Sequence, residues 1–307
     1  MALRLVSQRL ADSLGGYCLD GSRPGYWYEP PSQAPGVRAV GNRSWVLFMD
    51  GGAWCYDAHD CESRSKSWKG SSKNWPARYW PYSGPLDGSA KVNPAFAGFH
   101  RVLLGYCDGS SYTGDRIAPY KTSGGALMYF RGRAALEAQL ADLLDAGLRD
   151  AESVLFSGGS AGGLGTVFAS NRLQAQLPRA TVYKVLLISS FFMLLPEQRA
   201  ASAEPTCIKG RGASSKCVPW ALKMRGMCQL HNCTATLRAA GEGCGASEFS
   251  SGKGGGGKGD GGIVPAASTA RGAPRWPCLF PVKSLRSVRA PTFVINSAID
   301  SWQVTAM

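Results

Sequence analysis

The segment 153–177 constrains the fold of this chain more than any other part of the sequence. Apolar residues lead into GGSAG at 158–162, and a stretch of helical character follows. This is a G-x-S-x-G motif between a strand and a helix, a setting that holds a serine on a strained turn with its hydroxyl exposed. Glycines suit the turn because backbone packs against backbone there and leaves no room for a Cβ atom. The segment therefore predicts a nucleophile elbow with Ser160 at its tip.

Short apolar runs elsewhere predict the strands of a buried sheet. Between the second and third runs, leucines at helical spacing predict a helix over 133–146, which Gly147 terminates. Strands that alternate with helices predict one α/β domain over residues 1–307, with a mostly parallel central sheet flanked by helices. The predicted strands are 45–49, 101–106, 153–156, 184–188 and 292–296.

Two long segments fall outside this alternation. Residues 57–95 are rich in Ser, Trp, Pro and Lys, which predicts a long ordered loop. Residues 241–262 contain GKGGGGKGDGG and almost no apolar side chain, so we expect a flexible insertion there.

The cysteine content indicates an oxidising compartment. The chain has 10 cysteines, and their spacing does not form paired C-x-x-C zinc knuckles, so disulfides are the better interpretation. Two N-glycosylation sequons, at Asn42 and Asn232, also fit a secreted protein. The first residues carry Arg4, Arg9 and Asp12 without the apolar core of a signal peptide. Either the protein is cytosolic with free thiols, or its true start lies upstream, and we favour the second. No run of 18 apolar residues exists that would span a membrane.

Charge and motif content exclude other functional classes. The net charge is +13, but Lys and Arg are spread without a basic cluster interleaved with aromatics, which argues against nucleic-acid binding. The three histidines lack the spacing of a metal-binding motif, and no cysteine lies on a comparable strand–helix junction. We therefore expect neither a metal nor another cofactor.

A serine nucleophile needs oxyanion donors, an acid and a base, and the sequence offers candidates for the first two. In α/β-hydrolases the donors are the amide after the nucleophile, here Ala161, and an amide from a Gly-rich loop after an earlier strand. The segment 51–53, containing Gly52 and Ala53, fits that loop. Asp300 follows the last predicted strand, where the acid is expected.

The sequence offers no comparable candidate for the base. In the hydrolase order it follows the acid, and none of the residues after Asp300 is histidine. We interpret His59, His100 and His231 as structural or surface residues. We therefore expect the C-terminal part of the domain, with its histidine, to be missing from this sequence.

Six motifs in register resemble the pectin acetylesterase family, the plant-type carbohydrate esterases related to the Notum carboxylesterases. The segment YCDGSSYTGD is similar to the family's YCDGSSFTGD, and PTFVINSAIDSWQ to its PLFILNAAYDSWQ. The motifs are CLDGS at 18–22, DGGAWC at 50–55, YCDGSSYTGD at 106–115, YFRGR at 129–133, LFSGGSAGGLGT at 155–166 and PTFVINSAIDSWQ at 291–303.

This resemblance implies an α/β-hydrolase-like fold and a secreted enzyme that releases acetate from acetylated cell-wall pectin. It implies Ser160 as nucleophile and Asp300 as triad acid. It also implies specific groups for the oxyanion hole and two disulfides. These are the amides of Gly52, Ala53 and Ala161, and the pairs Cys18–Cys107 and Cys55–Cys61.

The chain also departs from the family pattern. The family's histidine lies after the DSWQ motif, its SDAGFF segment is LISSFF at 187–192 here, and Gly159 replaces its cysteine before the serine. Two alternatives therefore stay open. One is a Notum-like hydrolase of longer acyl esters, and the other is an inactive chain that lacks the catalytic histidine.

Overall fold

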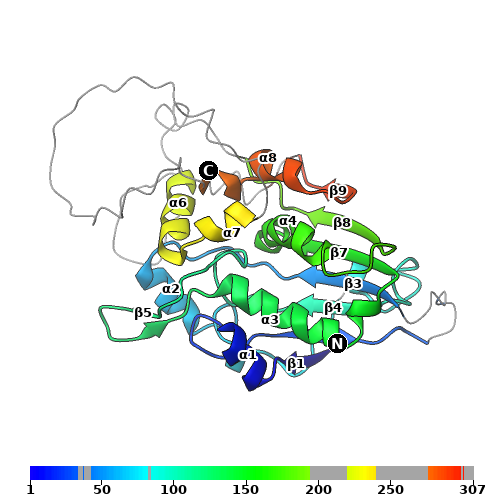
Figure 1. Cartoon of the computed structure of the whole chain (residues 1–307), viewed down its shortest axis with the longest axis horizontal. Coiled ribbons are helices and arrows are strands. Elements are labelled where there is room, and N and C mark those ends of the chain that lie inside the picture. Colours follow the sequence, from blue (N-terminus) through cyan, green and yellow to red (C-terminus); the bar gives the residue numbers. More distant parts are fainter. Residues whose placement is uncertain are drawn as a thin grey trace.

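The computed structural model describes residues 1–33, 37, 43–81, 84–193, 220–239, 276–298 and 300. Asn42 and the Gly-rich segment 241–262 lie outside this part of the chain, so the predictions made for them stay predictions. The described strands form a seven-stranded sheet in the order β1-β2-β4-β3-β7-β8-β9 (Figure 1). Its strands are β1 (Ala2–Leu5), β2 (Gly25–Glu29), β3 (Ser44–Met49), β4 (His100–Leu104), β7 (Ser153–Gly159), β8 (Val182–Ile188) and β9 (Thr292–Ile295), while β5 (Tyr120–Lys121) and β6 (Leu127–Met128) form a separate hairpin.

The sheet is parallel over its larger part. Strands β4, β3, β7, β8 and β9 run parallel, whereas β1 and β2 are antiparallel additions at one edge. All five predicted strands are confirmed, with ends shifted by a few residues, and the fold is the expected α/β-hydrolase type. Because the five strands are parallel, their carboxyl ends meet at one edge, where the loops that follow β3, β7 and β9 lie.

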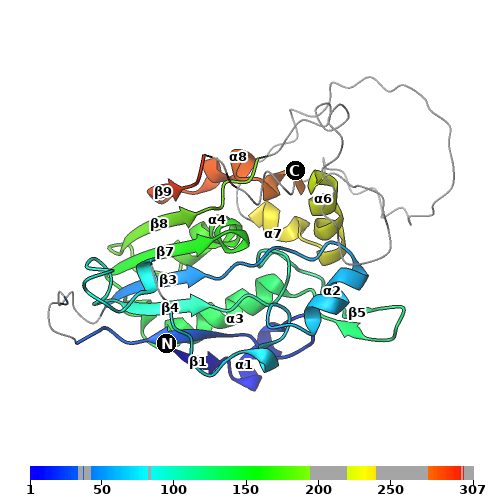
Figure 2. The same cartoon turned by 180° about the vertical axis from the view of Figure 1, so that it is seen from behind.

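Helices cover the sheet and its carboxyl edge. Figure 1 shows α3 and α4 in front of the strands, and Figure 2 shows the strands in front of both helices. Helices α6 and α7 lie beside α4 and near α2, beyond the end of β3 (Figure 1). The helices are α1 (Gln8–Leu14), α2 (Ala58–Ser65), α3 (Gly132–Asp145), α4 (Ala161–Gln174), α6 (Trp220–His231), α7 (Thr234–Ala239) and α8 (Pro281–Ser284), with 3₁₀ turns η1 (Ser72–Asn74), η2 (Gly84–Leu86), η3 (Leu148–Asp150), η5 (Trp276–Leu279) and η6 (Leu285–Ser287).

Each face of the sheet carries its own apolar core. On one face, Leu47 and Phe156 pack with leucines of α3 such as Leu140. On the other face, Trp27 and Leu103 belong to a second cluster, together with residues of the segment 72–86. The sheet is therefore buried on both faces at β3 and β4, which explains why these strands are almost continuously apolar.

The predicted long loop over 57–95 is only partly a loop. Its first part is α2, in which the Asp57 side chain accepts a hydrogen bond from the amide of Asp60 as an N-cap. The helix is held to the preceding segment by the Cys55–Cys61 disulfide. The sequence prediction was wrong here because α2 is mostly polar and has no apolar stripe to reveal it.

No helix in the described part of the chain is long and apolar enough to cross a membrane.

Candidate active site

Ser160 occupies a sharp turn between β7 and α4. Its backbone has φ 53° and ψ −126°, a conformation that is strained for a residue with a side chain. The turn is held because the Ser160 amide donates to the carbonyl of Ile188 at 3.0 Å. Gly162 lies so close to β3 that a Cβ atom would stand 2.1 Å from the Met49 carbonyl oxygen. These features are those expected of a nucleophile elbow, and the Ser160 side chain is partly exposed.

The loop after β3 packs directly against this turn. A Cβ atom on Gly51 would lie 3.2 Å from the Ser160 Cβ atom and 3.3 Å from the amide nitrogen of Ala161. The next two residues, Gly52 and Ala53, have φ of 136° and 55°. The chain therefore doubles back beside the elbow, with both amides in the turn.

Neighbouring side chains fix the carbonyl groups of this loop. Arg64 Nη2 donates to the Gly52 carbonyl at 2.8 Å, and the Tyr106 hydroxyl donates to the Ala53 carbonyl at 2.7 Å. Within the described residues, no group accepts a hydrogen bond from the amides of Gly52, Ala53 or Ala161. Three free amides at a strained serine are the donors that an oxyanion needs.

A half-buried ion pair lies at the base of the loop. Lys69 Nζ donates to Asp50, whose other carboxylate oxygen accepts from the Gly51 amide at 2.9 Å. Burial raises the pKa of Asp50 and lowers the pKa of Lys69, while the pairing of their charges opposes both shifts. The pair anchors the start of the loop through the Asp50 side chain.

Asp300 follows β9, which ends at the same edge of the sheet as the Ser160 turn. Ile295 at the end of β9 pairs with Ile188. Since Ile188 also accepts the amide hydrogen of Ser160, the ends of β7, β8 and β9 are adjacent. Asp300 is half-buried, and its role as triad acid stays a prediction.

None of the chain's three histidines is placed as a base for Ser160. His59 is exposed on α2, and His100 stacks on Trp45 at a ring distance of 4.1 Å. His100 also begins β4, at the edge of the sheet opposite Ser160. His231 is fully buried at the end of α6. The prediction that these are structural or surface histidines agrees with their positions.

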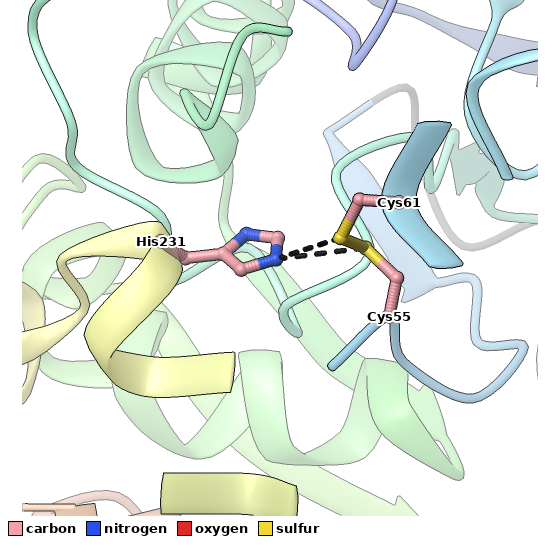
Figure 3. A group of neighbouring side chains, drawn as sticks. All are labelled: Cys55, Cys61 and His231. Carbon is pink, nitrogen blue, oxygen red and sulfur yellow. Dashed lines mark hydrogen bonds between the residues drawn. A yellow bond between two sulfur atoms is a disulfide. The ribbon is translucent and has the colours of Figure 1, made fainter. Parts of the chain in front are cut away.

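His231 packs against the Cys55–Cys61 disulfide (Figure 3). Its Nε2 lies 3.5 Å from each sulfur atom, and the Phe130 ring lies 4.3 Å from the imidazole. Because a disulfide carries no hydrogen, the imidazole Nε2–H is the donor. Burial lowers the pKa of His231 to about 3. The three residues group as metal ligands do, but sulfurs joined to each other offer no thiolate to a metal.

Both disulfides implied by the resemblance are present. Cys18 pairs with Cys107, and Cys55 pairs with Cys61. A further pair, Cys228–Cys233, brackets His231. The last pair was not predicted, because ten cysteines allow many connectivities.

The sequon at Asn232 lies at the junction of α6 and α7. Asn232 is exposed, and its Nδ2 donates to the Asp115 carbonyl at 3.3 Å. Glycosylation at Asn232 stays a prediction.

Sequence reasoning missed the residues that hold the loop. Arg64 and Lys69 lie in the polar segment after Cys55, which carries no recognisable motif. Tyr106 opens the YCDGSSYTGD motif, so its position was available, but nothing in the sequence ties its hydroxyl to Ala53.

Comparisons with known proteins identify the family and the fold of this chain. The model of the family described as pectinacetylesterase matches residues 1–209. Pectin acetylesterase 7 of Arabidopsis thaliana is 29% identical over 303 residues, covering 99% of this chain and 64% of that protein. The palmitoleoyl-protein carboxylesterase NOTUM of Homo sapiens is 25% identical over 294 residues, which are 94% of this chain and 49% of that protein. The crystal structure of the Wnt deacylase Notum from Drosophila superposes with a TM-score of 0.69 at 18% identity, covering 100% of this chain and 73% of that one. The chain spans 58% to 64% of the length of four Arabidopsis relatives.

Proposed function

This chain belongs to the pectinacetylesterase family, and on that premise we propose that it is a serine carboxylesterase that removes acetyl groups from cell-wall pectin. The observation that carries the proposal is the strained Ser160 turn packed against a loop with free amides at Gly52 and Ala53. The choice of substrate is supported by the similarity to Arabidopsis pectin acetylesterases.

The proposed reaction passes through an acyl-enzyme. Ser160 Oγ attacks the acetyl carbonyl carbon and gives its proton to a base, while the carbonyl oxygen becomes an oxyanion. The amides of Gly52, Ala53 and Ala161 donate to that oxyanion and stabilise it. The sugar hydroxyl leaves with the proton, and water then attacks the acetyl-serine and releases acetate. Asp300 would orient the base.

Histidine does not supply the base within the structure described. Ser160 makes no hydrogen bond to His59, His100 or His231. Loss of a triad member lowers kcat by about 10⁴-fold or more in serine hydrolases, although the oxyanion hole still contributes catalysis. For a polypeptide of these 307 residues we therefore expect slow hydrolysis that free imidazole accelerates by acting as the base.

Hydrolysis of p-nitrophenyl acetate, with and without imidazole, tests the proposal. Imidazole cleaves this ester unaided, so the quantity to compare is the rate of the wild type minus that of Ser160→Ala. The matched control is Ser153→Ala, at the amino end of the same strand, and it should behave as the wild type. A wild-type rate equal to that of Ser160→Ala at every imidazole concentration would refute catalysis by this chain and favour an inactive protein.

The rate of hydrolysis as a function of the number of acyl carbons distinguishes an acetylesterase from the Notum-like alternative. We expect acetyl esters to be preferred over esters of eight carbons or more. The opposite preference would favour a hydrolase of longer acyl groups, in keeping with the similarity to the NOTUM carboxylesterases.

We further propose that the protein is secreted and acts on acetylated pectin outside the cell. The disulfides Cys18–Cys107, Cys55–Cys61 and Cys228–Cys233 support an oxidising compartment. The net charge of +13 favours approach to an anionic polysaccharide. Expression behind a secretory leader should give a glycan on Asn232 that an endoglycosidase removes and that Asn232→Gln lacks.

A further inference from the structure

A cavity of about 530 Å³ lies on the face of the sheet opposite α3 and α4, next to the candidate active site. Its floor is apolar and consists of Phe48, Leu86 and Leu103. Arg78 and Trp80 line it from the segment before η2, and Asp50 lines it at the end of β3. The volume falls within the roughly 300–1,000 Å³ of small-molecule sites.

The cavity reaches the neighbourhood of Ser160 through β3. Phe48 approaches the elbow so closely that a Cβ atom on Gly159 would lie 3.2 Å from its ring. Asp50 directly precedes Gly51, whose own Cβ position would lie 3.2 Å from the Ser160 Cβ atom. The end of β3 therefore joins the lining of this cavity to the loop that packs against Ser160.

Arg78 supplies an available positive charge. Its side chain is exposed, and no carboxylate in the described part of the chain pairs with it. Its backbone is held by an isolated β-bridge to Ala2, and the Tyr79 amide donates to the Met1 carbonyl at 3.0 Å. Asp50 carries the opposing charge in the cavity, but its pairing with Lys69 offsets that charge. A planar guanidinium on a fixed backbone suits bidentate binding of a carboxylate.

Trp80 gives the cavity an aromatic wall. Its side chain is 61% exposed, so its ring is open to contact with a ligand. A pyranose ring presents apolar C–H groups on its faces, and these pack on an aromatic ring. An apolar floor, an aromatic wall and a guanidinium without a carboxylate partner among the described residues together match a sugar ring that carries a carboxylate.

We propose that this cavity is a uronate subsite. Arg78 binds the carboxylate of a galacturonate residue next to the acetylated residue, and Trp80 packs on the ring of that galacturonate. The inference rests on the proposed function for the choice of polymer, but it concerns binding and requires no turnover. It predicts that the chain discriminates free uronates from their methyl esters.

Binding of trigalacturonate and of its fully methyl-esterified form, measured by titration calorimetry on the full chain, tests the subsite. We expect Arg78→Gln to weaken binding of the acid by about tenfold or more and to remove the preference for the acid over the ester. Arg9→Gln is the matched control, since it removes one exposed arginine on α1 and should leave both affinities unchanged. Trp80→Ala should weaken both ligands, because it removes the surface under the ring.

The binding experiment can refute the subsite without refuting the proposed catalysis, and the hydrolysis assay can do the reverse. Arg78→Gln binding trigalacturonate as tightly as Arg9→Gln would overturn the subsite. Wild type that fails to bind trigalacturonate would overturn it as well, even if the protein cleaves p-nitrophenyl acetate. A chain that binds the acid through Arg78 but hydrolyses nothing would support the subsite while refuting the proposed catalysis.

Discussion

Gly51 lies against Ser160 with no space for a side chain between them. A Cβ atom on Gly51 would stand 2.4 Å from the Gly159 carbonyl oxygen and 3.2 Å from the Ser160 Cβ atom. The position of the loop relative to the nucleophile is therefore set by direct backbone packing. The active-site geometry and the stability of the sheet edge depend on the same contact.

Gly51→Ala tests this relationship. The clash is with backbone that cannot move cheaply, so we expect the free energy of unfolding to fall by about 1–3 kcal/mol, as for overpacked cores. Gly124→Ala is the matched control, because its nearest neighbour would be at 3.7 Å in ordinary contact. Urea denaturation measures both variants. Equal midpoints for Gly51→Ala and Gly124→Ala would show that the loop is not packed as described.

Tyr106→Phe tests the anchoring of the oxyanion loop. The Tyr106 hydroxyl donates to the Ala53 carbonyl and accepts from the Ser111 amide at 3.0 Å. Without this hydroxyl the Ala53 carbonyl is no longer held, so the loop amides point less accurately at the oxyanion. We therefore expect kcat to fall about tenfold with little change in KM. Tyr183→Phe, which removes another buried hydroxyl far from the loop, should leave kcat unchanged. A fall in kcat of equal size in both variants would point to a general loss of stability.

His231 should make the fold sensitive to acid. Its pKa is lowered to about 3 in the fold from an ordinary 6.5, so below pH 6.5 the unfolded chain binds a proton that the folded chain resists. The contribution of the neutral His231 to the free energy of unfolding is fully present above pH 6.5. It is lost as the pH falls from 6.5 toward 3. The loss by pH 4.5 is on the order of 2–3 kcal/mol.

Unfolding free energies of three proteins between pH 7 and pH 4.5 test this linkage. His231→Gln lacks the titration, so its difference from wild type should shrink as the pH falls. His59→Gln removes an exposed histidine and should follow the wild-type curve. Parallel curves for wild type and His231→Gln would contradict the burial of a neutral imidazole.

The two disulfides implied by the family should differ in their effect on stability. Cys18–Cys107 closes a loop with a sequence separation of 89, and Cys55–Cys61 one with a separation of 6. Chain entropy then gives about 4–5 kcal/mol for the first and about 2 kcal/mol for the second. Replacing each pair by serines and measuring urea unfolding checks the order. A larger loss for Cys55–Cys61 would mean that its contact with His231 outweighs chain entropy.

The sequence was sufficient to predict the parallel part of the sheet. Buried parallel strands are continuous apolar runs, and β3, β4 and β7 have this signature. The antiparallel edge was not predicted. β1 has exposed or half-buried side chains and gains its structure from pairing with β2, which no local pattern reveals.

In the candidate active site, too, the sequence predicted the local turn and missed the tertiary contacts. Ser160 lies in a motif whose geometry is local, so its strained turn follows from the sequence. The contacts of Tyr106 with Ala53 and of His231 with Cys55 join segments far apart in the chain. Such contacts depend on tertiary packing, and one sequence carries no signal for them. The cavity at Arg78 is of the same kind, because it forms only when the segment before η2 lies over β3.

Covalent labelling of the nucleophile tests the central claim most directly. The protein is treated with a fluorophosphonate, with and without imidazole, and the modified peptide is identified by mass spectrometry. We predict one adduct, on Ser160, that imidazole increases, that Ser153→Ala retains and that Ser160→Ala lacks. A wild-type protein that stays unmodified under both conditions, or an adduct that persists in Ser160→Ala, would contradict the assignment of Ser160 as the nucleophile.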